Sequence, residues 1–306
     1  MDTIQLFIDQ LPDNTEYINI SNKGLTICPD LSRFKNLKSL NCSGNKLTSL
    51  YKLNDGLESL YCFGNQLNTL PKLNDGLKYL DCSRNQLKFL PVLNYSLEEL
   101  YCMTNQLESL PELTDGLLAL HCDINQLKSL PKLNDSLKKL YCSENQLKSL
   151  PKLNDSLYLL DCSSNQLKYL PKLNDSLYLL DCSSNQLEYL PKLNDSLYLL
   201  DCSSNQLKSL PPLNDGLEEL YCSSNPLNLL NSHDSIGTLR QQIQTLTRFK
   251  HLYFSLKFKT QFKRWLWELV REPKIALKYH PSYLAEHLVD GFELDDILEV
   301  WIGNDE

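Results

Sequence analysis

The feature that most constrains this chain is a repeat of 20 residues. Its unit reads Leu-x-x-Leu-x-Cys-x-x-Asn-x-Leu-x-x-Leu-Pro-x-Leu-Asn-x-x, and clear copies run from Leu37 to the copy that begins at Leu217. A column of asparagines begins at Asn45, recurs at every period and ends at Asn225. A short fixed period indicates stacked supersecondary units rather than one or two ordinary globular domains.

The two halves of the unit predict different local structures. In the first clear copy, which begins at Leu37, Leu40 and Cys42 alternate with polar residues, which predicts a short strand with one face inward. The second half carries Pro in most copies, as at Pro71, which disfavours a helix and favours an extended or polyproline-like return. Asn-Asp-Gly or Asn-Asp-Ser, as at 74–76, then turns the chain into the next strand. One unit cannot cover its own apolar side chains, so stacking should bury continuous columns of leucine.

Cysteines and asparagines form two further columns. Unpaired Cys behaves as a small hydrophobe, and the Cys column stands where an apolar residue is needed. No C-x-x-C spacing indicates a zinc site, so we expect reduced core thiols in a reducing compartment. We expect the asparagine amides to satisfy backbone groups at successive turns. The ten cysteines of the column are Cys42, Cys62, Cys82, Cys102, Cys122, Cys142, Cys162, Cys182, Cys202 and Cys222.

The repeat resembles that of the leucine-rich-repeat family. The family motif LxxLxLxxNxL is matched over about 37–231, with Cys in place of the third Leu. The LPxLN segment is similar to that of short-repeat bacterial effectors, and the Asn-, Lys- and Tyr-rich composition to that of uncharacterised repeat proteins of giant viruses. The resemblance implies a leucine-rich-repeat solenoid with a curved parallel β-sheet on its concave face and extended, polyproline-like convex segments.

We expect three parts along the chain. Residues 1–14 are predicted to form an amphipathic N-terminal cap, because an end repeat cannot leave its core open. Residues 15–231 form the repeats, with an irregular first copy at 15–36 followed by ten copies of the 20-residue period. Residues 232–306 are predicted to be a small α-helical tail or cap. The apolar residues expected on the inner face of the N-terminal cap are Ile4, Phe7, Ile8 and Leu11.

The predicted tail has helical patterning and a split charge. Residues 240–280 carry ten Lys and Arg against two Glu, whereas residues 281–306 carry eight Asp and Glu and no base. Three interpretations stay open: a cap on the last repeat, a partner-docking module, and a basic-aromatic surface for nucleic acid or membrane, which the acidic remainder disfavours. The apolar stripe at steps of three and four comprises Phe254, Phe258, Phe262, Trp265 and Leu269.

Composition limits the environment and partners. The net charge of −8 argues against nucleic acid as the main partner. The first residues lack a basic segment followed by an apolar run, so no signal peptide is expected. No stretch approaches the roughly 18 apolar residues of a membrane span. We therefore expect a cytoplasmic monomer that binds neither membrane nor nucleic acid.

The outward positions of the strands are where the repeats differ most, and they are rich in Tyr, hydroxyl groups and acids. This composition suits protein recognition, although Tyr also simply favours strands. The candidate partner-binding residues are Tyr101, His121, Tyr141, Tyr158, Leu159, Asp161, Tyr178, Leu179, Asp181, Tyr198, Leu199 and Asp201.

Three nearly identical repeats (157–176, 177–196 and 197–216) should place equal residues side by side. A row of exposed leucines would be an apolar strip of the kind that marks interaction sites. Three stacked carboxylates repel one another by about 1 kcal/mol per pair at most in water-like surroundings, and a basic partner would relieve this. The alternative is that duplication has copied a tolerated sequence without a function.

The sequence offers no catalytic, cofactor-binding or metal-binding constellation. It has no glycine-rich phosphate loop, no Ser or Cys paired with a base, and no acidic loop of the calcium-binding type. We therefore predict a non-enzymatic scaffold that binds a protein partner on the concave strand face. The alternative is an adaptor whose helical tail recruits other machinery, for example ubiquitin transfer; no Cys follows Cys222 to serve as a ligase nucleophile.

Overall fold

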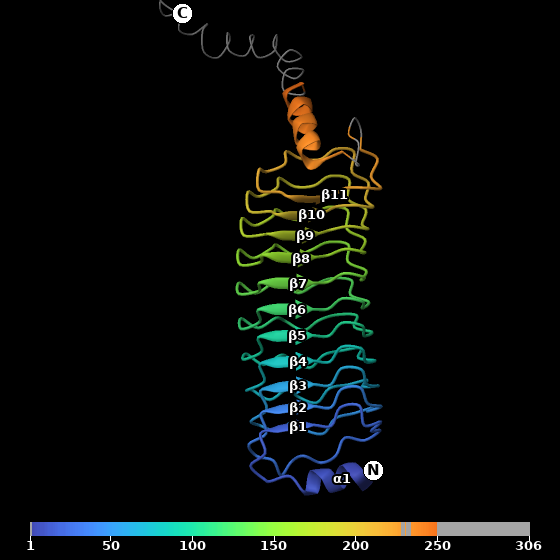
Figure 1. Ribbon diagram of the computed structural model, residues 1–306, viewed down its shortest axis with the longest axis vertical. Helices are drawn as coiled ribbons and strands as arrows, with labels where there is room; N and C mark the ends of the chain where they lie inside the picture. The colour runs from blue at the N-terminus through green and yellow to red at the C-terminus, as the bar shows by residue number, and fades with distance from the viewer. Residues whose placement is uncertain (1, 228–229, 231–233, 250–306) are drawn as a thin grey trace, which may run out of the picture. The chain divides into compact units, whose positions relative to one another are not determined.

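The structure is a computed structural model that describes residues 2–227, 230 and 234–249. The chain divides into two compact units, Met1–Gln244 and Thr245–Glu306. The first unit holds the whole sheet (Figure 1). Of the second unit, the structure describes residues 245–249, which are helical. The aromatic stripe and the acidic block predicted for the tail lie outside the described residues.

The sheet has eleven strands in an order that follows the chain, and every neighbouring pair is parallel. A short helix precedes it, and residues 236–249 form a second helix. The elements are α1 Asp2–Asp9, β1 Tyr17–Asn19, β2 Ser39–Asn41, β3 Ser59–Tyr61, β4 Tyr79–Asp81, β5 Glu99–Tyr101, β6 Ala119–His121, β7 Lys139–Tyr141, β8 Leu159–Asp161, β9 Leu179–Asp181, β10 Leu199–Asp201 and β11 Glu219–Tyr221.

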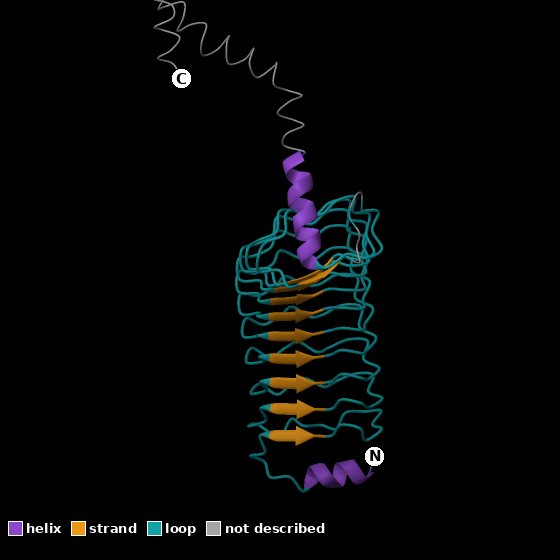
Figure 2. Cartoon of the chain, turned by 45° about the horizontal axis from the view of Figure 1, so that its top comes forward, coloured by secondary structure: helices purple, strands orange, loops and turns teal. Residues whose placement is uncertain are grey.

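Each repeat contributes one strand, and the strands lie one above another along one side of the stack (Figure 2). The middle residue of the strand points inward; Leu60, Leu80 and Leu100 are fully buried. Pairing keeps exact repeat register, with Leu60 opposite Leu80 and Leu80 opposite Leu100. The return segments that carry Pro have no regular secondary structure. The predicted solenoid with one strand per repeat is confirmed.

The cysteine column is part of the core, as predicted. All eleven cysteines of the chain are free and buried. Burial is the main cause that raises the pKa of these thiols well above the ordinary value, for example at Cys62 and Cys162. The Cys column therefore packs as small apolar side chains between the leucine columns.

The first asparagine column satisfies backbone groups of two successive repeats, as predicted. The Asn145 Nδ2 group donates to the carbonyl of Cys122 at 3.0 Å and to that of Cys142 at 3.2 Å. The Asn145 Oδ1 atom accepts from the Leu127 N–H at 3.0 Å. One buried amide thus joins two strands and a turn, and the same arrangement recurs along the stack.

A second asparagine column, in the turn before most of the strands, has a role that the sequence did not predict. The Asn154 Nδ2 group donates to the carbonyls of Asp135 at 3.1 Å and Leu137 at 2.8 Å. Asn214 makes the equivalent bonds to the preceding repeat. These residues were expected only to turn the chain, but their side chains also link each turn to the one before it.

At the N-terminal end, α1 covers the first repeat. Ile8 is buried, and Arg33 donates to the carbonyl of Ile8 at 2.7 Å and to that of Leu11 at 3.0 Å. These bonds satisfy carbonyl groups that the end of a helix leaves without intrahelical partners. Ile4 and Leu11 are partly buried against the core. The expectation for Phe7 was wrong, because its side chain is 42% exposed.

At the C-terminal end of the first unit, residues 234–244 occupy the place of a further repeat. Leu239 and Ile243 join the buried core. The Arg240 guanidinium donates to the carbonyls of Asp215 at 3.5 Å and Leu217 at 3.2 Å. In the preceding junction the Asn214 amide takes the two equivalent positions, on the carbonyls of Asp195 and Leu197. This substitution supports a capping role for the start of the tail.

The residue before each asparagine of the first column has a left-handed backbone. Gly44 and Gly64 hold this position in the early repeats, with φ of 65° in both. From Arg84 onward it is held by non-glycine residues, including Ile124 with φ of 52°. A β-branched residue in this region is strained, so the turn geometry is imposed by the stacking of the repeats.

Candidate functional site

The outward face of the sheet is the candidate site, and the first and third residues of each strand form it. In most strands these two residues are half-buried around a buried middle residue. Side chains of successive strands stand roughly 4.8 Å apart along each column. Residues of neighbouring repeats therefore touch, and the face consists of rows that run across the strands.

An aromatic stack occupies this face from β3 to β7. The ring centroids are 4.8 Å apart from Tyr61 to Tyr79 and 5.3 Å from Tyr79 to Tyr101. They are 4.3 Å apart from Tyr101 to His121 and 4.2 Å from His121 to Tyr141. Tyr79 comes from the first strand position and the other four from the third, so Tyr79 bridges the place where the third position holds an aspartate.

The stack carries no charge of its own at neutral pH. Burial, and secondarily Lys139, lowers the pKa of His121. Burial together with Asp81 raises the pKa of Tyr79 to about 12. The Tyr101 hydroxyl donates to Glu99 at 2.8 Å, and its pKa is raised by burial and by this bond. The aromatic stack thus presents ring edges and protonated phenols.

From β8 to β10 the face changes to two parallel rows. Leu159 pairs with Leu179 and Leu179 with Leu199, while the aspartate two residues later in each strand pairs in the same register. All six side chains are half-buried. The row of leucines and the row of aspartates (Asp161, Asp181 and Asp201) lie two residues apart along each strand, which is roughly 6.6 Å.

The aspartates also have a local structural role. The Asp161 Oδ1 atom accepts from the backbone N–H of Ser163 at 3.0 Å and from its hydroxyl at 2.7 Å. Asp201 makes the same two bonds with Ser203, and Asp181 accepts from the backbone N–H of Ser183. Asn41 makes the same two bonds with Ser43 in an early repeat. An Asp or Asn here ends the strand with a side-chain turn.

This role uses one carboxylate oxygen at two of the three aspartates. The bonds of Asp161 and Asp201 to the following serine use Oδ1, and within the described part of the chain their Oδ2 atoms have no hydrogen bond or ion pair. Burial raises the pKa of Asp181, with smaller contributions from the flanking Asp161 and Asp201 charges. The three carboxylates form a row of hydrogen-bond acceptors in register with the row of leucines.

The predicted tyrosines Tyr158, Tyr178 and Tyr198 directly precede the same three strands. Tyr178 and Tyr198 stack with centroids 5.0 Å apart and an interplanar angle of 8°. Tyr178 is 47% exposed, whereas Tyr158 and Tyr198 are half-buried. The structure therefore brings the candidate residues together as two adjoining patches, the aromatic stack and the Leu–Asp rows.

Sequence reasoning missed Tyr61 and Tyr79 as members of the stack. Tyr61 occupies the same position of the repeat as Tyr101. It differs from the predicted candidates only in lying farther from them along the sequence. Tyr79 is the first residue of its strand, whereas the other rings come from third positions. The third position of that strand is Asp81, and an aromatic residue at the first position could have been recognised as its replacement in the stack. The hydrogen bonds of the aspartates to the following serines were also missed, although the Asp-x-Ser spacing was visible.

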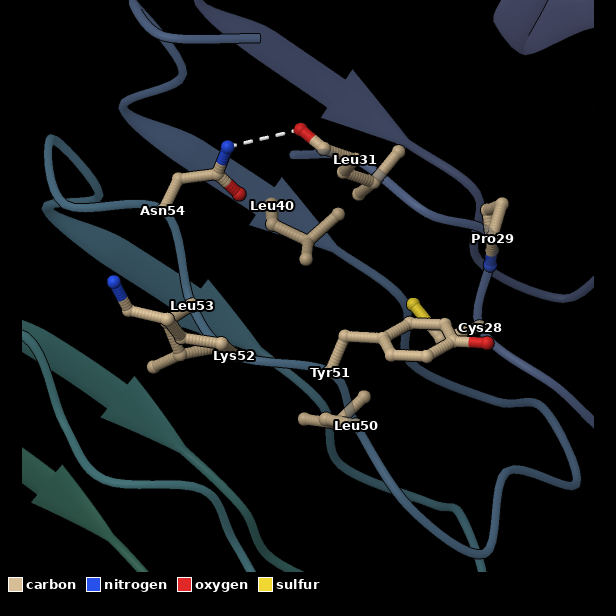
Figure 3. A pocket seen from close by; sticks show the side chains of 9 residues that line it. All are labelled: Cys28, Pro29, Leu31, Leu40, Leu50, Tyr51, Lys52, Leu53 and Asn54. Atoms are coloured by element: carbon tan, nitrogen blue, oxygen red, sulfur yellow. Dashed lines mark hydrogen bonds between the residues drawn. The ribbon is translucent and has the colours of Figure 1, made fainter. Parts of the chain in front are cut away.

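Two pockets lie near the early repeats. The larger, of about 250 Å³, is lined by residues from the return segments 52–55 and 72–75 and not by strand residues. The smaller is lined by Cys28, Leu40 and Tyr51 among others (Figure 3). Its volume of about 20 Å³ is room for roughly one water molecule. Within the described residues, no group of three or more His, Cys, Asp or Glu side chains is placed to hold a metal ion. None of the described helices has the length and apolar character needed to cross a membrane.

Comparison with known proteins gives similarity at the level of structure. No protein-family model matches the chain, and no curated protein does. Among solved structures, the chain is 36% identical to YopM, a leucine-rich effector protein from Yersinia pestis. That match covers 71% of this chain and 74% of the other, with a TM-score of 0.57.

Two further structures are similar. YopM from Yersinia enterocolitica WA-314 is 31% identical, with a TM-score of 0.50 over 74% of this chain. The chain spans 60% of that protein's length. The leucine-rich repeat domain of LRIM1 is 21% identical, with a TM-score of 0.56 over 71% of this chain and 73% of the other, a likeness of fold alone.

Proposed function

This chain belongs to the leucine-rich-repeat family, and from that premise we propose that it is a non-enzymatic protein-recognition module. The partner binds the outward face of the sheet, across the aromatic stack and the Leu–Asp rows. The observation that carries the proposal is the aromatic stack itself. Five half-buried rings in contact on one open face form a rigid amphipathic surface of the kind that dominates protein interfaces.

The comparisons add support of a general kind. The YopM from Yersinia pestis is described as a leucine-rich effector protein. Another solved structure of this fold, the leucine-rich-repeat part of FLRT2, lies in an octameric complex with Latrophilin 3 and Unc5D. Repeats of this kind offer an extended surface to a partner because the sheet grows by one strand per unit.

The test is capture of partners from a lysate by the full chain and by variants that exchange residues between repeats. Tyr101→Asn with Tyr141→Asn introduces the residue that Asn41 already places in this column, so the strand should be preserved. The matched control is Tyr169→Ser with Tyr189→Ser. These tyrosines are 50% and 60% exposed away from the strands, in a column where Ser149 and Ser209 also occur.

We expect partners retained by the control and lost from the strand-face variant. Equal capture by both variants, with unchanged melting temperatures, would place the binding site elsewhere and refute the proposal. The adaptor alternative depends mainly on residues 250–306, which lie outside the described residues. Its experiment is deletion of 250–306, which removes partners of the tail while leaving partners of the strand face bound.

A further inference from the structure

The charge of the sheet face is strongly one-sided. The eleven strands contain six acidic residues and one basic residue, Lys139, which leaves a net charge of −5 on the strands. Three of the six acids form the row Asp161, Asp181 and Asp201, in register on adjacent strands. A partner that covers this row must supply positive charge, because carboxylates removed from water without a partner are costly.

The neighbouring leucines narrow the chemistry further. Each of β8, β9 and β10 presents a leucine and an aspartate on the same face, roughly 6.6 Å apart along the strand. A Lys or Arg side chain matches this pair, because its aliphatic stem can cover the leucine while its charged head contacts the carboxylate. Laid along the strand, the stem contacts Leu179 and the head reaches the carboxylate of Asp181.

We propose that the Leu–Asp rows of β8–β10 bind a basic helix of a protein partner, which places one Lys or Arg on each of three adjacent strands. This proposal rests on the protein-recognition function proposed above and names the chemistry of its partner. The helix lies across the strands, and each cation takes one leucine for its stem and one aspartate for its head.

The spacing of the rows favours a helix over an extended segment. Three strands place their carboxylates at about 0, 4.8 and 9.6 Å. On a helix, residues i, i+3 and i+7 lie at about 0, 4.5 and 10.5 Å along the axis and share one face. Alternate residues of an extended strand lie at about 0, 6.6 and 13.2 Å, so the third side chain no longer lies opposite the third carboxylate.

The chain offers a variant that removes the charge and keeps the fold. Asp161→Asn, Asp181→Asn and Asp201→Asn together retain the Oδ1 acceptor for the following serine, as Asn41 does with Ser43. A matched control is Asp155→Asn, Asp175→Asn and Asp195→Asn. These aspartates are exposed in the turns of the same repeats, so the control changes the net charge equally.

The probe is a fluorescent helical peptide with arginines at i, i+3 and i+7, measured by anisotropy against the full chain. We expect the triple variant of the row to weaken binding by about tenfold, and the turn control to leave it within about twofold. A peptide of equal composition with its arginines dispersed around the helix should bind about as weakly as the variant.

No binding of the spaced peptide, equal binding of both peptides, or equal loss in the turn control would overturn this inference. Those results leave the protein-recognition proposal standing if Tyr101→Asn with Tyr141→Asn still abolishes partner capture. Conversely, if the strand-face variant captures the same partners as the parent, the protein-recognition proposal is refuted even if the peptide binds.

Discussion

The His121 imidazole lies flat against the Tyr141 ring, with centroids 4.2 Å apart and an interplanar angle of 17°. Its other face meets Tyr101 at 4.3 Å. A protonated imidazole would have to be held between two rings on a face where burial already lowers the pKa of His121. The ladder of strands therefore fixes a neutral histidine inside the aromatic stack.

This arrangement predicts a pH dependence of stability with a defined sign. The pKa of His121 in the folded chain lies below its ordinary value, so the unfolded chain binds more protons between the two values. The free energy of unfolding should fall as pH drops through this window and be unaffected by His121 above it. NMR titration gives the pKa, and urea unfolding at several pH values gives the stability.

The control for the histidine is His121→Tyr, which keeps an aromatic ring and removes the titration. We expect the variant to lose less stability than the parent between neutral and mildly acidic pH. Burial raises the pKa of Asp123 and Asp181, so protonation of these carboxylates stabilises the folded state as pH falls. The parent and the variant share this contribution, so the difference between their pH profiles reports His121 alone. Identical pH profiles for parent and variant would contradict the prediction.

The first asparagine column should matter more than any exposed residue of the same repeat. Asn145→Leu removes the bonds to Cys122 and Leu127 and leaves buried backbone groups without partners. We expect a loss of about 3 kcal/mol in the free energy of unfolding. The control Lys148→Leu changes an exposed side chain and should stay within about 0.5 kcal/mol. Equal melting temperatures would show that the amide does not carry these bonds.

The fold could be predicted well from the sequence because the same residues occur at the same positions of each repeat. Leu60, Cys62 and Asn65 recur at fixed offsets, and each offset corresponds to an inward position or to a turn that needs an amide. Errors arose where the period ends. Phe7 could not be oriented because no neighbouring repeat fixes the face of α1, and its side chain is exposed.

The candidate site was predicted only in part, for a related reason. Register placed Leu159, Leu179 and Leu199 in one row, and the structure confirms that placement. Contacts that cross columns, such as Tyr61 with Tyr79, depend on side-chain directions that a period does not specify. The period does not specify the outward residues, because packing does not constrain those positions.

The C-terminal junction predicts a specific effect of Arg240. Its guanidinium donates to the carbonyls of Asn214 and Leu217, in the place that the Asn214 amide takes one repeat earlier. Arg240→Ala should therefore accelerate amide hydrogen exchange in the last repeat and lower the free energy of unfolding by about 2 kcal/mol. Arg248→Ala, at an exposed position, is the control. Unchanged exchange around Leu217 would contradict a capping role for this contact.

The left-handed turn column predicts a stabilising substitution. Ile124 has φ of 52° and is 43% exposed, whereas Gly44 and Gly64 hold the same position without strain. Ile124→Gly should raise the free energy of unfolding by about 1 kcal/mol, because relief of strain exceeds the extra entropy of glycine in the unfolded chain. Ser149→Gly, at an ordinary exposed position, should destabilise the chain. A decrease in both variants would show that the turn carries no strain.

Thiol chemistry tests the interior of the whole solenoid at once. The eleven cysteines are buried, and burial raises the pKa of Cys162 and its neighbours well above the ordinary value, so few are thiolates. At neutral pH we expect a disulfide-exchange reagent to label less than about one thiol per native chain, and all eleven in denaturant without reductant. Ser149→Cys adds one exposed thiol and should react at once, which shows that the reagent is active. Rapid labelling of the native parent would mean that the repeats open, and a denatured count below eleven would mean that column neighbours have formed disulfides.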